Sequence, residues 1–155
     1  MKMDSLHDQS YRFEELLPLI REQIGRGGNV RIAPRGTSMM PMLRQGMDTV
    51  VLSPVPDQLR KYDIPFYRRG NGQFVLHRIV AVGETYTCVG DNQFELEPGV
   101  GKDQMIAVVS AFTRGDREIS VTSLSYQCYC RFWHYSRPAR HLWRRAMGWL
   151  RRKLR

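Results

Sequence analysis

The strongest constraint on the fold is a series of short segments, beginning near residue 29, in which apolar and polar residues alternate. Alternation with a period of two is typical of strands with one buried face. Gly70-Asn71-Gly72 favours a hairpin between two of these segments. Many short strands at this spacing predict a mainly β domain, built as a curled mixed sheet or a partly open barrel. The expected strands are residues 29–33, 49–52, 64–69, 73–82, 85–89, 104–113 and 118–121.

Helices are expected on both sides of this domain. Apolar residues recur at helical spacing in residues 11–25, where Pro18 either begins the helix or kinks it. Residues 139–155 predict an amphipathic helix, because at about 100° per residue their apolar side chains fall within an arc of about 160°. The expected organisation is a leader and helix over 1–28, a β domain over 29–122 and an aromatic and basic tail over 123–155.

The net charge of +9 is concentrated near the carboxyl end. Nine Lys and Arg residues and no acidic residue follow residue 130, whereas residues 1–118 hold equal numbers of basic and acidic residues. Nucleic-acid binding by the whole domain would favour a basic surface spread across it. The charge pattern therefore does not indicate a nucleic-acid partner.

The three cysteines, Cys88, Cys128 and Cys130, are an odd set and do not indicate a disulfide scaffold. Cys128, Cys130 and His134 lack the spacing and the fourth ligand of a zinc site, so we expect inert thiols and no metal or other cofactor. The sequence has no apolar run of about 18 residues, and its first residues do not form a secretory signal. We therefore expect a cytoplasmic location, with peripheral attachment to a membrane left open.

Ser38 lies in Gly36-Thr37-Ser38-Met39-Met40-Pro41, where glycine and proline favour a short irregular turn that presents the hydroxyl. Such a turn is by itself more often structural, because a serine becomes a nucleophile only when a base accepts its proton. His77 is the histidine within the predicted sheet, in an apolar strand where an unpaired imidazole would be costly. Asp91, in the turn Gly90-Asp91-Asn92, could accept a hydrogen bond from that imidazole and hold its tautomer.

Four segments, taken together and in this order, resemble the signal peptidase I and LexA-like serine peptidase superfamily. They are Gly36-x-Ser38-Met39-x-Pro41, Asp63-Ile64-x-Phe66-Tyr67-Arg68, His77-Arg78-Ile79-Val80 and Gly90-Asp91-Asn92, and the resemblance covers roughly residues 29–113. It implies a β-rich, partly open barrel with an exposed serine. His77 stands where many members have a lysine base, so the chain is similar to the histidine-bearing branch, which includes archaeal and endoplasmic reticulum signal peptidases.

On this resemblance the chain would be a serine endopeptidase. Ser38 would attack the peptide carbonyl, and its backbone N–H would contribute to the oxyanion hole. His77 would act as general base and then as general acid, with Asp91 as the orienting carboxylate. A peptide or protein substrate would bind as an added strand along an open sheet edge.

Two alternatives remain. One is a non-catalytic module that keeps the peptidase-like sheet as a peptide clamp. The other is a self-cleaving regulator, which would need a DNA-binding domain and a cleavable Ala-Gly or Cys-Gly bond. Neither dipeptide occurs in the sequence.

The tail helix over 139–155 has two interpretations of equal weight. Its basic residues and tryptophans suit an anionic membrane surface, and the same helix could instead dock on the body or on a partner. Nucleic acid is a third, weaker alternative. The residues expected to make the membrane or partner contact are Trp143, Arg144, Arg145, Met147, Trp149, Leu150, Arg151 and Arg152.

Overall fold

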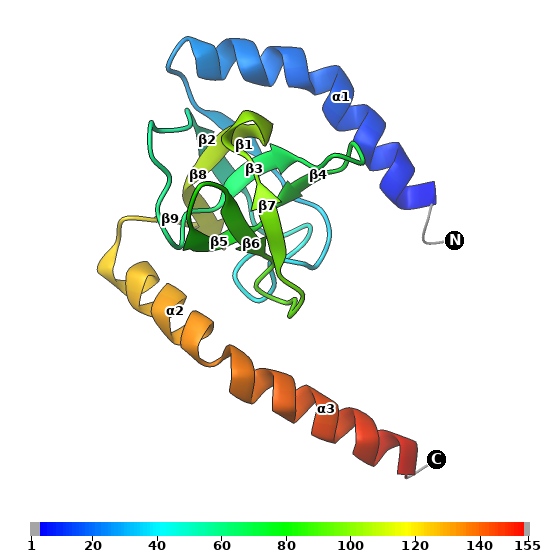
Figure 1. The fold of residues 1–155 in the computed structure, drawn as a ribbon. Helices are drawn as coiled ribbons and strands as arrows, with labels where there is room; N and C mark the ends of the chain where they lie inside the picture. The colour runs from blue at the N-terminus through cyan, green and yellow to red at the C-terminus, as the bar shows by residue number, and fades with distance from the viewer. Residues whose placement is uncertain (1–3, 154–155) are drawn as a thin grey trace.

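A computed structural model describes residues 4–153 of the chain, and the side chains of residues 14–149. Within these residues, nine strands form two antiparallel sheets, and helices flank the sheets at both ends of the chain (Figure 1). The predicted mainly β class, with a leading helix and a C-terminal helix, is confirmed. In the described residues neither sheet closes on itself.

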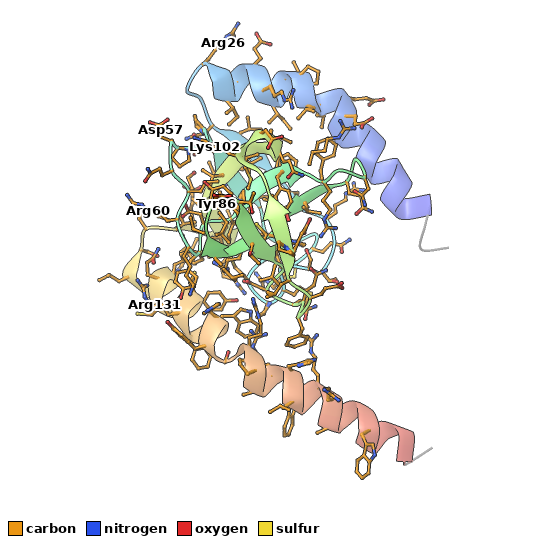
Figure 2. The ribbon with its side chains drawn as sticks, viewed as in Figure 1. Arg26, Asp57, Arg60, Tyr86, Lys102 and Arg131 are labelled. Atoms are coloured by element: carbon orange, nitrogen blue, oxygen red, sulfur yellow. The ribbon has the colours of Figure 1, made fainter. Side chains whose placement is uncertain are left out.

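The larger sheet has the strand order β1-β2-β8-β3-β4, with β9 paired to β8. Its strands are β1 (Val30–Ile32), β2 (Val50–Ser53), β3 (Pro65–Arg68), β4 (Phe74–Leu76), β8 (Met105–Arg114) and β9 (Arg117–Ser120). The smaller sheet has the order β5-β6-β7, formed by β5 (Arg78–Val82), β6 (Tyr86–Val89) and β7 (Glu97–Val100). A short 3-10 helix, η1 (Lys102–Gln104), leads into β8, and the Lys102 ammonium donates to the carbonyl oxygen of Asp57 at 2.6 Å (Figure 2).

The apolar segment 73–82, predicted as one strand, is divided at His77. The part before His77 is β4, at the edge of the larger sheet, and the part after it is β5, in the smaller sheet. The N–H of Ile79 donates to Asp63 O at 2.9 Å, so β5 also pairs with the chain that precedes β3. His77 therefore lies at the junction between the two sheets.

Strand β7 was not predicted from the sequence. It contains Pro98 and Gly99, and both residue types are depleted in strands. The smaller sheet tolerates them because β7 is its edge strand, where a missing N–H leaves no ladder bond unmade. Strand β7 begins at Glu97, which is a residue of the candidate site.

Helix α1 (Asp4–Gly25) begins earlier than the predicted residue 11 and continues through Pro18. Proline removes one helical hydrogen bond and crowds the preceding turn. The last turns are nevertheless held in place, because Ile20 and Ile24 are buried in the main core with Val50 and Leu52 of β2. Tertiary packing thus outweighs the local cost of the proline.

Two apolar clusters form the interior. The main core joins α1, the larger sheet, the serine turn and the helix that follows β9. The second cluster lies between the sheets and contains Leu59, Tyr67, Ile79, Cys88 and Val100. Burial raises the pKa of the Cys88 thiol to about 12, so this cysteine behaves as a core residue.

The aromatic segment after residue 123 forms a helix, α2 (Leu124–Tyr135), that the sequence analysis did not predict. Its Tyr126 and Cys130 side chains are buried in the main core, whereas Arg131 lies on the outer side of the helix (Figure 2). The sequence does contain a helical pattern in this segment, because its apolar residues recur at helical spacing, at Tyr126, Tyr129, Cys130 and Trp133. The next helix, α3 (Arg137–Lys153), agrees with the predicted amphipathic helix, and its second half extends away from the body (Figure 1).

A buried ion pair attaches α2 to the body. Arg78 donates to both carboxylate oxygens of Asp91, from Nε at 2.8 Å and from Nη2 at 2.7 Å. Its Nη1 donates to the Tyr126 hydroxyl at 2.8 Å and contacts Cys130 Sγ at 2.9 Å. Burial opposes the charge of Arg78, yet the adjacent Asp91 carboxylate raises its pKa well above the usual value. The Trp133 indole donates to Asp91 O at 2.9 Å, so Asp91 binds α2 through its backbone and binds Arg78 through its side chain.

We predict that Arg78→Met lowers the free energy of unfolding by about 3–5 kcal/mol, because it leaves the buried Asp91 carboxylate without its partner. Urea denaturation of the full chain measures this loss. The control is Arg31→Met, which removes an ion pair with Glu118 whose side chains are half exposed, and a loss on the order of 0.5 kcal/mol is expected there. Equal losses for the two variants would contradict the role given to the buried pair.

Candidate active site

Ser38 lies in an irregular turn between β1 and β2, as the glycine and proline pattern predicts. Gly36 has φ +90°, a conformation that favours glycine, and the N–H of Met40 donates to Thr37 O at 3.2 Å. Met39 and Met42 are buried in the main core, while Ser38 is partly exposed. The buried methionines fix the turn, so the serine is presented from a rigid support.

A second clamp closes the segment before β2. The buried carboxylate of Asp48 accepts three hydrogen bonds from Arg44, from its backbone N, Nε and Nη2, at 2.8, 3.0 and 2.8 Å. The side-chain bonds from Arg44 lower the pKa of Asp48, despite its burial. This carboxylate therefore has a structural role, and it stabilises the turn that carries the serine.

The serine turn packs directly against the turn Gly90-Asp91-Asn92. The backbone N–H of Asn92 donates to Ser38 O at 2.8 Å, and its side-chain amide donates to Thr37 O at 3.1 Å. A Cβ at Gly90 would lie 2.6 Å from Ser38 O and 3.1 Å from Ser38 Cβ. Glycine is therefore required at residue 90, because any side chain would collide with the serine turn.

His77 and Gly90 flank the same end of the smaller sheet. His77 immediately precedes β5 and Gly90 immediately follows β6, and Arg78 of β5 is paired with Val89 of β6. His77 is therefore adjacent to the end of this strand pair at which Gly90 abuts Ser38.

The His77 imidazole is buried and is oriented through Nδ1. Nδ1 lies 3.3 Å from Glu97 Oε2 and 3.4 Å from the Tyr67 hydroxyl oxygen. The Tyr67 hydroxyl donates its own proton to Glu97 Oε2 at 2.8 Å, so both neighbours of Nδ1 act as acceptors toward it. This arrangement favours the tautomer with the proton on Nδ1, which leaves the lone pair of Nε2 available.

Glu97 is held as a carboxylate. Arg69 donates to it twice, from Nε at 2.8 Å and from Nη2 at 2.7 Å. Burial favours the neutral acid, but the bonds from Arg69 and then from Tyr67 lower the pKa of Glu97 below its usual value. A charged carboxylate therefore faces the Nδ1 side of the His77 ring.

The environment keeps His77 neutral at pH 7. Burial, followed by the positive charge of Arg69, lowers the pKa of His77 to about 4, although the Glu97 carboxylate opposes the shift. A neutral imidazole can accept a proton, as a general base must.

The expectation that Asp91 contacts His77 is replaced by a different pairing. Asp91 binds Arg78, as described above, and Glu97 is the carboxylate that contacts the imidazole. The physical reason is that Arg78, the residue after His77, binds both carboxylate oxygens of Asp91. Glu97 reaches this position because β7 pairs with β6, where Glu97 is opposite Cys88.

The hydroxyl and the backbone N–H of Ser38 form no hydrogen bond with any residue that the structure describes. The N–H is therefore available as a donor to a developing oxyanion. In the same residues no hydrogen bond joins the hydroxyl to His77. Catalytic hydrogen bonds are often long or unformed before substrate binds.

The structure also locates the residues predicted for membrane or partner contact. Arg144 donates from Nη1 to Asn92 O at 3.2 Å and from Nη2 to Asn92 Oδ1, so it is in contact with the body. Trp143, Arg145 and Trp149 are exposed, and Met147 is partly buried. Leu150, Arg151 and Arg152 have side chains outside the described set.

The cysteines of the tail face different surroundings. Cys130 is buried against Arg78, whereas Cys128 is exposed. Within the described residues, no group of three or more His, Cys, Asp or Glu side chains is placed to hold a metal ion. No helix over residues 4–153 combines the length and apolarity needed to cross a bilayer.

We predict that Gly90→Ala destabilises the serine turn by about 1–3 kcal/mol, the range typical of overpacked sites, because its Cβ would collide with Ser38 O and Ser38 Cβ. Thermal denaturation measures the loss. Gly70→Ala is the control, since a Cβ there would have no neighbour within 4 Å. If both variants have the same melting temperature as the wild type, the close packing of the two turns is refuted.

The chain was also compared with known proteins. No family model matches it, and no curated protein sequence matches it.

Proposed function

We propose that this protein is a serine endopeptidase of the signal peptidase and LexA-like type, with Ser38 as nucleophile and His77 as general base. The observation that carries the proposal is the position of Gly90. Ser38 abuts this glycine, and His77 flanks the same end of the β5–β6 pair. A hydroxyl beside a neutral imidazole is the pairing that activates a serine, and the proposal gives these roles to Ser38 and His77.

Glu97 takes the orienting role in this proposal. A carboxylate on the Nδ1 side holds the imidazole tautomer and stabilises the imidazolium that forms during the reaction. Glu97 Oε2 lies 3.3 Å from Nδ1, whereas Asp91 is occupied by Arg78. The proposed set is therefore Ser38, His77 and Glu97.

The proposed reaction has two steps. His77 Nε2 accepts the proton of Ser38 Oγ as the oxygen attacks the peptide carbonyl, and the Ser38 N–H donates to the developing oxyanion. The imidazolium then gives its proton to the leaving amine, which leaves an acyl-enzyme on Ser38. Water, activated by the same imidazole, hydrolyses this ester and restores the serine.

The substrate, a peptide or a protein, is proposed to bind as an added strand on β4. This strand pairs with β3 alone in the described residues, and it leads directly into His77. A peptide paired with the free edge of β4 would use main-chain hydrogen bonds, which suit substrates of varied sequence. Its chain would then pass beside the proposed base.

A non-catalytic peptide clamp is the second candidate. It is favoured by the lack of a hydrogen bond between Ser38 and His77 in the described residues. This alternative predicts peptide binding that survives Ser38→Ala and is never followed by turnover. Fluorescence anisotropy with a labelled peptide, read together with product analysis, separates the two candidates.

We predict that Ser38→Ala and His77→Ala each reduce labelling by a fluorophosphonate probe, and hydrolysis of peptide mixtures, by about 10³-fold or more. The two residues act as one unit, so each single loss removes the activation. Ser125→Ala and His141→Ala are matched controls, because both residues are exposed and lie on the tail helices. Equal labelling of Ser38→Ala and the wild type would disprove the proposal.

We predict that kcat/KM falls on the acid side with an apparent pKa of about 4, because His77 must be neutral to act as a base. Arg69→Met should move this limb to higher pH, since the Arg69 charge lowers the pKa of His77. Glu97→Gln should move it to lower pH, since the carboxylate charge raises that pKa.

The control for this pH profile is Arg68→Met. Arg68 is adjacent in sequence, but it is exposed and pairs with Glu14. Its removal should leave the acid limb in place. An acid limb that Arg69→Met and Glu97→Gln leave unmoved would mean that another group titrates.

A further inference from the structure

Helix α3 is held to the body by its polar side. Arg140 Nη1 donates to Asp91 O at 3.4 Å, and Arg144 donates to Asn92 as described above. The His141 ring lies 4.8 Å from the Phe94 ring. At about 100° per residue, these three side chains span one side of the helix.

Most of the apolar side of α3 points away from the body. On the same helical wheel, the apolar arc is centred about 150° from the side that contacts the body. Leu142, Trp143 and Trp149 are 66%, 68% and 53% exposed. The second half of the helix stands clear of both sheets in Figure 1. Docking of this helix on its own body therefore leaves its hydrophobic face in solvent.

The charge around this face indicates which kind of partner can cover it. Helix α3 contains seven basic residues and no acidic residue, and no acidic residue follows Glu118 in the sequence. A second copy of the same helix would bring like charge against it. A nucleic acid would pair with the arginines and would leave the apolar stripe uncovered. An anionic lipid surface satisfies both, because acyl chains accept the apolar side and headgroups accept the flanking arginines.

We propose that the exposed apolar face of α3, formed by Leu142, Trp143, Ala146, Met147 and Trp149, docks in the interface of an anionic lipid bilayer. The helix lies parallel to the surface, with the β body on the opposite side, facing water. Tryptophan rings suit the headgroup layer, where one edge is apolar and the other is hydrated. The arginines beside the apolar arc are long enough to reach headgroup phosphates.

This docking would hold the serine turn near the membrane, on the water-facing side of α3. A hollow of about 630 Å³ lies between α3 and that turn, and its lining includes Met40, Pro41, Trp133 and Trp143. Trp143 thus belongs both to the hollow and to the lipid-facing side. Met40 and Pro41 belong to the turn that carries Ser38, so a substrate held at the same surface would lie near that turn, and that consequence alone rests on the proposed peptidase function.

Co-sedimentation of the full chain carrying Ser38→Ala with vesicles tests the docking without any catalysis. Vesicles of phosphatidylcholine with phosphatidylglycerol are expected to bind at least tenfold more protein than vesicles of phosphatidylcholine alone. Raising the salt concentration should weaken the binding, because exposed charges are screened. A shift of tryptophan emission to shorter wavelength should accompany it.

Leu142→Gln and Trp143→Gln are expected to reduce anionic-vesicle binding by at least tenfold, without changing the net charge. Leu124→Gln is the matched control, since Leu124 is 84% exposed at the far end of α2. Circular dichroism verifies that each variant keeps its helices. Equal binding to both kinds of vesicle, or an equal loss in Leu124→Gln, would overturn the proposal. A dimer in lipid-free sedimentation that Leu142→Gln dissolves would also overturn it, by assigning the face to a second copy.

Discussion

Adjacent residues at one end of the β5–β6 pair make separate contacts, and the rest of the structure depends on them. His77 contacts Glu97, whereas the next residue, Arg78, binds Asp91 and Tyr126 of α2. Gly90 packs against the serine turn, whereas the next residue, Asp91, binds Arg78 and Trp133 of α2. The candidate site and the attachment of the tail are thereby separated by one residue.

The buried Arg78–Asp91 pair stabilises more than the contact between two side chains. Both groups are almost fully enclosed, and a bidentate pair with further hydrogen bonds is the arrangement that compensates for the loss of water. Asp91 also accepts from Trp133 through its backbone, and its neighbours touch the serine turn. The attachment of α2 and the position of Ser38 therefore depend on one short turn. A change in α2 that displaced this turn would therefore also displace Ser38.

The electrostatics around His77 balance opposing influences. Burial and Arg69 keep the imidazole neutral, while Glu97 draws the proton to Nδ1 and would stabilise an imidazolium. Arg69 holds Glu97 charged and at the same time limits the basicity of His77. A neutral, oriented imidazole is suited to accept a proton at neutral pH. Glu97 lies on the edge strand β7, so the position of its carboxylate depends on the pairing of β7 with β6.

The sequence by itself determined the mainly β class, the leading and C-terminal helices and the irregular turn at Ser38, because periodicity, glycine and proline act through local geometry. Tertiary structure decided that residues 73–82 divide at His77, that Glu97 rather than Asp91 contacts the imidazole, and that the basic side of α3 meets the body. These outcomes depend on register and packing between segments far apart in the chain, which no local pattern encodes. The sequence did not predict β7, the strand that carries Glu97, because Pro98 and Gly99 have weak strand propensity. Both residues are tolerated there because β7 is an edge strand.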